Sequence, residues 1–238
     1  MCAYLESGSS EICYRCARKT IESLAPFARR CATCDLPLRN GKCGNPLCNW
    51  HERERYFKWN YAIAMRSGVL ERAISDFKYQ NRHGWRQIFG RVLAGFLDDE
   101  SDTFEHFDLI IASPTYVDPD GTRKYDHTRE VILAADEESE GRWPFDTEDT
   151  PAIVKTARTE PFVKKKWAER KKIAETELRA ALTIPEASRT RGKNILVYDD
   201  VFTDGFTLRE VARALIEDGG AKGVCGVTLT RQPIRQKS

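Results

Sequence analysis

Residues 194–208, NILVYDDVFTDGFTL, combine an apolar run, two adjacent acids, a Thr/Gly loop and the start of a helix. The run ILVYD is typical of a buried strand, and the residues after the loop repeat apolar side chains at helical spacing. Thr207 and Glu210 fit a capping box at the start of that helix. A strand, a short loop and a helix in this order predict one unit of a parallel α/β sheet.

The chain from residue 53 onward repeats this alternation of patterns. Further strands are expected around residues 61–68, 107–115, 152–156 and 223–231, and further helices around 70–77, 88–96 and 127–141. The acidic stretch 137–150 is expected to be exposed and irregular. The sequence therefore predicts an α/β fold, with a parallel sheet flanked by helices.

The composition makes no overall case for a nucleic-acid or membrane partner. The chain of 238 residues has 38 Lys and Arg against 36 Asp and Glu, a net charge of +2, so any basic surface must be local. No segment approaches the roughly 18 consecutive apolar residues of a membrane span, and the N-terminus lacks the pattern of a signal peptide. We therefore expect a cytoplasmic protein whose thiols stay reduced.

Seven of the eight cysteines lie within the first 48 residues. This predicts a small cysteine-rich domain, residues 1–52, ahead of the α/β domain, residues 53–238. Two pairs at ligand spacing, Cys31 with Cys34 and Cys43 with Cys48, can close a tetrahedron around a structural Zn²⁺ ion. The segment between the pairs has the length of a ribbon hairpin, which predicts a zinc ribbon.

A third pair, Cys13 and Cys16, leaves two interpretations open. These thiols form a second metal site with Cys2 and an outside ligand such as His51, or they are a remnant that binds no metal. Cys225 stands alone in an apolar run and is most simply a small core residue.

The loop after the predicted ILVYD strand (195–199), with Asp199 and Asp200 one step before it, has the chemistry of a sugar-phosphate site. Open α/β sheets bind ligands at the carboxyl ends of their strands, where Asp199 and Asp200 can accept hydrogen bonds from vicinal hydroxyls. The loop amides and the helix N-terminus can hold an anion, and Gly205 permits a close approach. Together these features describe a ribose 5-phosphate ligand, against the simpler alternative of a solvated acidic turn.

The segment VYDDVFTDGFT resembles the phosphoribosyl-diphosphate (PRPP) motif of type I phosphoribosyltransferases. A cysteine ribbon, then ISDFKYQNRHG, DLIIASPT, a Lys/Arg-rich stretch and finally this motif are similar in order to the ComF-like branch of that family. The resemblance implies a type I phosphoribosyltransferase fold behind a zinc ribbon. It also implies a pentosyltransferase that moves ribose 5-phosphate from PRPP to an acceptor, with Mg²⁺ neutralising the pyrophosphate.

The resemblance assigns roles to particular residues. Asp199 and Asp200 would hold the ribose hydroxyls as the catalytic pair. The cradle of the 5-phosphate would consist of Thr203, Asp204, Gly205, Phe206 and Thr207. Asp204 stands where the family loop usually has Thr, and a carboxylate ~4 Å from a phosphate repels it by ~4 kcal/mol at an effective dielectric of about 20, unless it points away or meets a cation. Candidates for contact with the pyrophosphate are Arg123, Lys124 and Arg129.

The ComF-like resemblance also implies an alternative function, that of a nucleic-acid-associated adaptor in DNA uptake during competence. The segment 162–172, FVKKKWAERKK, surrounds Trp167 with lysines, a pattern that single-stranded nucleic acids bind and that is also common on solvated helix faces. The four histidines show no triad context. His127 either lines the site or, more simply, is an exposed residue at a helix start.

Overall fold

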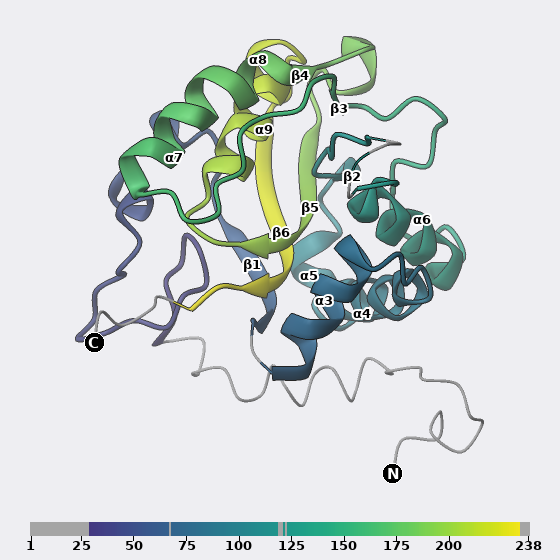
Figure 1. Cartoon of the computed structure of the whole chain (residues 1–238). Helices are drawn as coiled ribbons and strands as arrows, with labels where there is room; N and C mark the ends of the chain where they lie inside the picture. The colour runs from purple at the N-terminus through teal and green to yellow at the C-terminus, as the bar shows by residue number, and fades with distance from the viewer. Residues whose placement is uncertain (1–28, 67, 119–120, 122, 234–238) are drawn as a thin grey trace.

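The computed structural model describes residues 29–66, 68–118, 121 and 123–233. Four strands form a parallel sheet in the order β1-β6-β5-β2 (Figure 1). Their bounds are Asn60–Met65 for β1, Leu109–Ala112 for β2, Asn194–Phe202 for β5 and Gly223–Arg231 for β6. A short antiparallel pair joins β3 (Val154–Lys155) to β4 (Leu182–Thr183). The predicted α/β class with a helix-flanked parallel sheet is thus confirmed.

The helices cover both faces of the sheet. Figure 1 shows α3 (Gly68–Tyr79), α4 (Trp85–Asp99) and α6 (His127–Ser139) on one side, and α7 (Trp167–Ile173) and α9 (Phe206–Glu217) on the other. The remaining helical segments are α2 (Glu52–Arg55), α5 (Ser101–Phe104) and α8 (Arg179–Ala181), the π-helical turn η4 (Ala174–Leu178), and the 3₁₀ turns η3 (Pro46–Asn49) and η5 (Ala187–Arg189). None of the helices in the described ranges has the length and apolar character needed to cross a bilayer.

Strand β5 divides the core between these two layers. Leu196 and Tyr198 pack with α3, α4 and α6, whereas Ile195 and Val197 pack with α9. This alternation follows from the two-residue repeat of a strand. All nine residues of β6 are buried, as its central place in the sheet requires.

The helices α4 and α6 pack closely at Gly90. A Cβ atom at Gly90 would lie 2.7 Å from the Ala134 backbone, so any larger side chain there would push the helices apart. The acidic stretch 137–150 is more ordered than predicted. Its first residues continue α6, and Trp143, Phe145 and Asp146 are buried. Asp146 is stabilised there by the Ala152 amide, 2.8 Å from its Oδ2, and by Arg189.

The cysteine-rich segment packs directly on the sheet. Cys31, Cys34 and Leu47 share a core with Phe202 and Phe206. The Asp35 carboxylate accepts a hydrogen bond from the first part of β1, with 2.9 Å between its Oδ2 and the Ala62 amide. Cys2, Cys13 and Cys16 lie outside the described residues. The predicted boundary near residue 52 stays a prediction.

Candidate functional site

The loop between β5 and α9 lies at the carboxyl end of the parallel sheet. Gly205 precedes the helix with a φ of 94°, a conformation that glycine adopts without a steric penalty. A Cβ atom at this position would lie 2.6 Å from the Phe202 ring. The close turn at Gly205 therefore brings the loop backbone to the N-terminus of α9.

The predicted capping box at the start of α9 is wrong. The N-cap is Gly205, without a side-chain cap, and Thr207 lies inside the helix. Glu210 is fully buried and pairs with Arg209. The spacing of Thr207 and Glu210 fits a capping box, but an ion pair on the packed face of α9 uses the glutamate instead.

Asp204 meets a cation, and its carboxylate turns back onto the helix. Its Oδ2 accepts a hydrogen bond from Arg170 Nη1 at 3.1 Å, and its Oδ1 lies 3.3 Å from the Phe206 amide. Its carbonyl accepts from Asn45 Nδ2 at 3.1 Å. The side chain is 12% exposed. The chain therefore places one of its own anions, already paired, at the N-terminus of α9.

Asp199 and Asp200 point to opposite faces of β5, because successive side chains of a strand alternate. Asp200 is buried against α3 and α6, where it pairs with Lys78 and lies 3.1 Å from His127 Nε2. Asp199 is only partly buried. The two acids, which the sequence treats as a pair, have different surroundings.

These surroundings separate the ionisation of the two carboxyl groups. Burial opposes the charge of Asp200, but the Lys78 ammonium and His127 outweigh it and hold its pKa well below the usual range. Burial, together with the charge of Asp200, raises the pKa of Asp199 to about 7. Asp200 is therefore a fixed anion, whereas Asp199 titrates near neutral pH.

His127 is a site residue that sequence reasoning interpreted most simply as exposed. It is 4% exposed, and burial lowers its pKa. Its Nδ1 atom is buried and has no hydrogen-bond partner in the described part of the chain. No local signal marked it, because its contact with Asp200 spans 73 residues of sequence.

The three basic residues that the sequence suggests for pyrophosphate contact have different surroundings in the structure. Arg123 lies against Tyr79, with 3.4 Å between Nη2 and the phenol oxygen. Lys124 is exposed. Arg129 is turned toward the carbonyls of Asp146 and Glu148. A cation that the sequence did not single out, Lys155, is close enough to Arg123 that burial and this charge lower its pKa to about 8.

The Lys/Arg-rich segment docks onto the loop through α7. The Trp167 ring lies 5.2 Å from the Phe206 ring and 6.1 Å from the Trp50 ring. Lys171 lies over the ring of Trp50 at 4.8 Å. Trp167 is thus packed in part against the loop and Trp50, and 36% of the residue stays exposed.

Four of the predicted metal ligands come together. One sulfur from each of Cys31, Cys34, Cys43 and Cys48 lies within 4.8 Å of the others. The Cys34 and Cys43 sulfurs are 3.8 Å apart, equal to the ~3.8 Å edge of a tetrahedron with Zn–S bonds of about 2.3 Å. This donor set could hold a metal ion such as zinc.

The backbone amides around the four cysteines and the ionisation of the thiols both favour binding of a cation by this cluster. The amides of Thr33 and Asn45 lie 3.4 Å from the sulfurs of Cys31 and Cys43, where they stabilise thiolates. The contact with the Cys31 thiol is the largest cause of each shift. It lowers the pKa of Cys34 and raises the pKa values of Cys43 and Cys48. The four thiols therefore ionise as a coupled group, and a bound divalent cation would allow all four to be thiolates.

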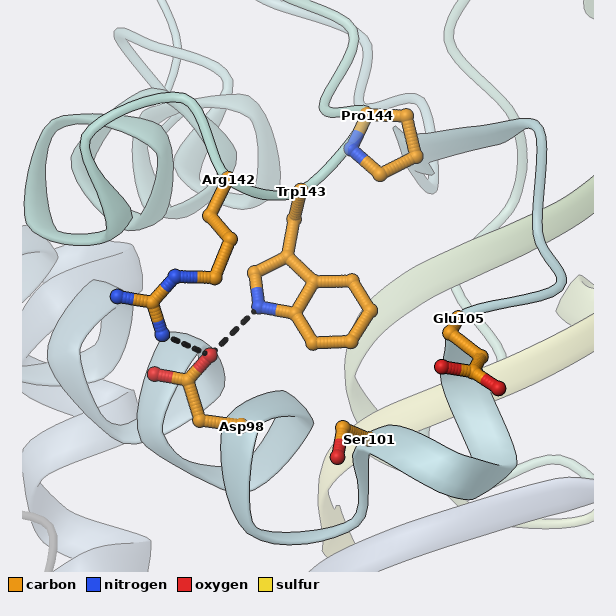
Figure 2. A pocket seen from close by; sticks show the side chains of 6 residues that line it. All are labelled: Asp98, Ser101, Glu105, Arg142, Trp143 and Pro144. Carbon is orange, nitrogen blue, oxygen red and sulfur yellow. Dashed lines mark hydrogen bonds and ion pairs between the residues drawn. The ribbon is translucent and has the colours of Figure 1, made fainter.

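A hollow of about 410 Å³ lies elsewhere on the surface (Figure 2). It is lined by Asp98, Ser101, Glu105, Arg142, Trp143 and Pro144. Asp98 Oδ1 accepts from Trp143 Nε1 at 2.9 Å and pairs with Arg142 at 2.8 Å. The hollow lies past the last turn of α6, whereas His127 begins that helix, so the hollow and the Asp200 site are separate.

Comparison of the chain with models of known protein families and with curated proteins gives no match.

Proposed function

We propose that this chain is a phosphoribosyltransferase-like protein that binds PRPP with Mg²⁺ and transfers its phosphoribosyl group to an acceptor. The observation that carries the proposal is the glycine turn between β5 and α9, at the carboxyl end of a parallel sheet, with Asp199 in the last part of β5, three residues before that strand ends at Phe202. The cysteine cluster beside it fits the zinc ribbon of the ComF-like branch. The proposed type I phosphoribosyltransferase fold and the proposed ComF-like family both depend on this combination of a glycine turn and a cysteine cluster.

The two acids divide the work in this proposal. Asp199, partly exposed, accepts hydrogen bonds from the ribose hydroxyls. Asp200 is a positioning residue that orients Lys78 and His127 around the same strand end. Thr203 and Thr207 hold the 5-phosphate together with the loop amides other than that of Phe206, which already donates to Asp204.

The chemistry asks for positioning and charge stabilisation, with no nucleophilic side chain. The bond from C1 to pyrophosphate breaks as the acceptor approaches C1. Mg²⁺, when bound with the ligand, would neutralise the departing pyrophosphate. Arg123 and Lys155 add positive charge from the chain.

Calorimetric titration with PRPP and Mg²⁺ tests the proposal. We expect saturable binding that Asp199→Asn weakens by about 10- to 100-fold, the worth of hydrogen bonds to a charged acceptor. Asp102→Asn, a change of the same type at an exposed residue of α5, is the matched control and should bind as the unmodified chain does. Equal PRPP affinity in Asp199→Asn and in this control would contradict the proposal.

The raised pKa of Asp199 predicts a pH dependence. The carboxylate is the better acceptor of the two protonation states, so PRPP affinity should rise as the pH passes through about 7. PRPP itself titrates in this range, and Asp199→Asn reports that contribution alone. Titrations of both proteins from pH 6 to pH 8 should give a steeper rise for the unmodified chain, and parallel profiles would remove Asp199 from the site.

A further inference from the structure

Arg231, the last residue of β6, is the largest fully buried side chain in the described part of the protein, at 1% exposure. Its Nε donates to the Cys34 carbonyl at 2.9 Å, and its Nη2 lies 3.5 Å from the Cys34 sulfur. Its Nη1 donates to the carbonyls of Phe202 at 2.9 Å and Thr203 at 2.7 Å. One guanidinium thus joins the cysteine cluster to the β5–α9 loop.

The charge of this guanidinium needs a partner. Arginine stays protonated in proteins, and a buried charge is costly unless an opposite charge lies near it. Within the described ranges, Arg231 makes no ion pair with a carboxylate; the nearby Asp35 instead pairs with Arg30 at 3.0 Å. Burial raises the pKa of the Asp35 carboxyl group and the guanidinium of Arg231 is close enough to oppose that rise, but the acidic side chain that Arg231 contacts directly is the thiol of Cys34.

Asn45 makes a second connection between the cysteine cluster and the β5–α9 loop. The amide of Asn45 lies 3.4 Å from the Cys43 sulfur, and its side-chain Nδ2 donates to the Asp204 carbonyl at 3.1 Å. The Oδ1 of the same side chain accepts from the Leu47 amide at 3.3 Å, which fixes the orientation of the group. Three consecutive loop carbonyls, 202 to 204, therefore accept hydrogen bonds from residues that also contact a cysteine sulfur.

We propose that Arg231 is the counter-charge of a metal–tetrathiolate centre, and that Arg231 and Asn45 make this metal a positioning element of the β5–α9 loop. Four thiolates around a divalent cation carry a net charge of −2, which Arg231 partly offsets. Without the metal nothing holds the four sulfurs at one point, so the contacts of Arg231 with Cys34 and of Asn45 with Cys43 no longer fix the loop carbonyls that the same two residues hold. The loop is ordered only while the metal is bound.

Metal and ligand affinities are then linked. If the metal orders the loop, a ligand that needs the ordered loop must raise the affinity for the metal by the same factor. The effect of the ligand on metal affinity rests on the proposed PRPP function. The effect of the metal on loop order rests on the cysteine cluster alone, so an experiment can refute one effect without refuting the other.

The first test measures zinc affinity of the full chain by competition with a chromophoric chelator. We expect Arg231→Met, which keeps the length and removes the charge, to lower zinc affinity by about 10- to 100-fold, as loss of outer-shell partners does. Arg231→Lys should retain most of the affinity. Arg142→Met, an exposed arginine outside the cluster, is the control. Equal zinc affinity in Arg231→Met and the control overturns the counter-charge role.

The second test follows amide hydrogen exchange of the loop peptide, residues 202–206, against that of α4. Stripping zinc from the unmodified chain should speed exchange in the loop far more than in α4. Asn45→Ala, which keeps every charge, should speed loop exchange even with zinc bound and so tests the link if Arg231→Met does not fold. An equal rise in loop and α4, or no rise in either, overturns the coupling. Zinc-dependent loop exchange without PRPP binding would refute only the proposed ligand.

Discussion

Replacing Cys34 by serine should remove one metal ion per chain and lower the melting temperature by about 10 °C or more. Cys34 is fully buried and shares the core of Phe57, Phe202 and Phe206. Loss of one of four ligands opens the centre and leaves Arg231 without its nearest anion. A loss of several kcal/mol, at about 2–4 °C per kcal/mol for a chain of this size, gives that shift.

Cys225→Ser is the matched control for this experiment. Cys225 is also buried, but it lies in β6 within the other core, and burial raises the pKa of its thiol to about 12. This variant should keep its full metal content and lose about 1–3 kcal/mol, the cost of burying a hydroxyl. Metal analysis and thermal unfolding decide the matter. A Cys34→Ser protein with undiminished zinc and an unchanged melting temperature would contradict a metal centre at these four cysteines.

Asp204→Asn should strengthen PRPP binding by about 10-fold or more, and Arg170→Met should weaken it by a similar factor. In the native pair, 3.1 Å apart, Arg170 offsets the repulsion that Asp204 exerts on an incoming phosphate. Removing the acid leaves a free guanidinium beside the loop, whereas removing the guanidinium leaves a free carboxylate. Each unit charge ~4 Å from the phosphate is worth up to ~4 kcal/mol at an effective dielectric of about 20, before solvent screening reduces it.

The double variant Arg170→Met/Asp204→Asn completes this cycle. Because the pair is nearly neutral as a unit, the double variant should bind PRPP within a few-fold of the unmodified chain, although the single variants diverge. Calorimetry on all four proteins at one ionic strength measures this. If both single variants bind PRPP like the unmodified chain, no phosphate approaches Asp204 and the loop is not a phosphate cradle.

The elements of the fold were predictable where one segment carries its own pattern. The apolar run of β5, the glycine turn and the amphipathic repeat of α9 are local features, and all three formed, although β5 continues past the predicted ILVYD to Phe202 and α9 begins at Phe206. The four clustered cysteines were predictable for the same reason, since ligand spacing is a property of short segments. Zinc itself, and the PRPP ligand, stay predictions.

The partners of these elements could not be predicted, because they come from distant segments. Asp200 meets Lys78 and His127, Asp204 meets Arg170 and Asn45, and Arg231 meets Cys34, with separations between 34 and 197 residues. The same limit explains the errors. Glu210 is a charged residue and the 137–150 stretch is acidic, which is typical of exposed positions. Tertiary packing buries Glu210 and, within the stretch, Trp143, Phe145 and Asp146.

The place of β6 in the sheet has a consequence for biosynthesis. This strand is the last of the described chain, yet it lies between β1 and β5 and pairs with both. During synthesis, β1 therefore cannot pair with β6 until the polypeptide up to about residue 231 has emerged from the ribosome. In that interval the unpaired edges of β1 and β5 are accessible to chaperones. Assembly of the loop must be one of the final events, since Arg231 arrives with that strand.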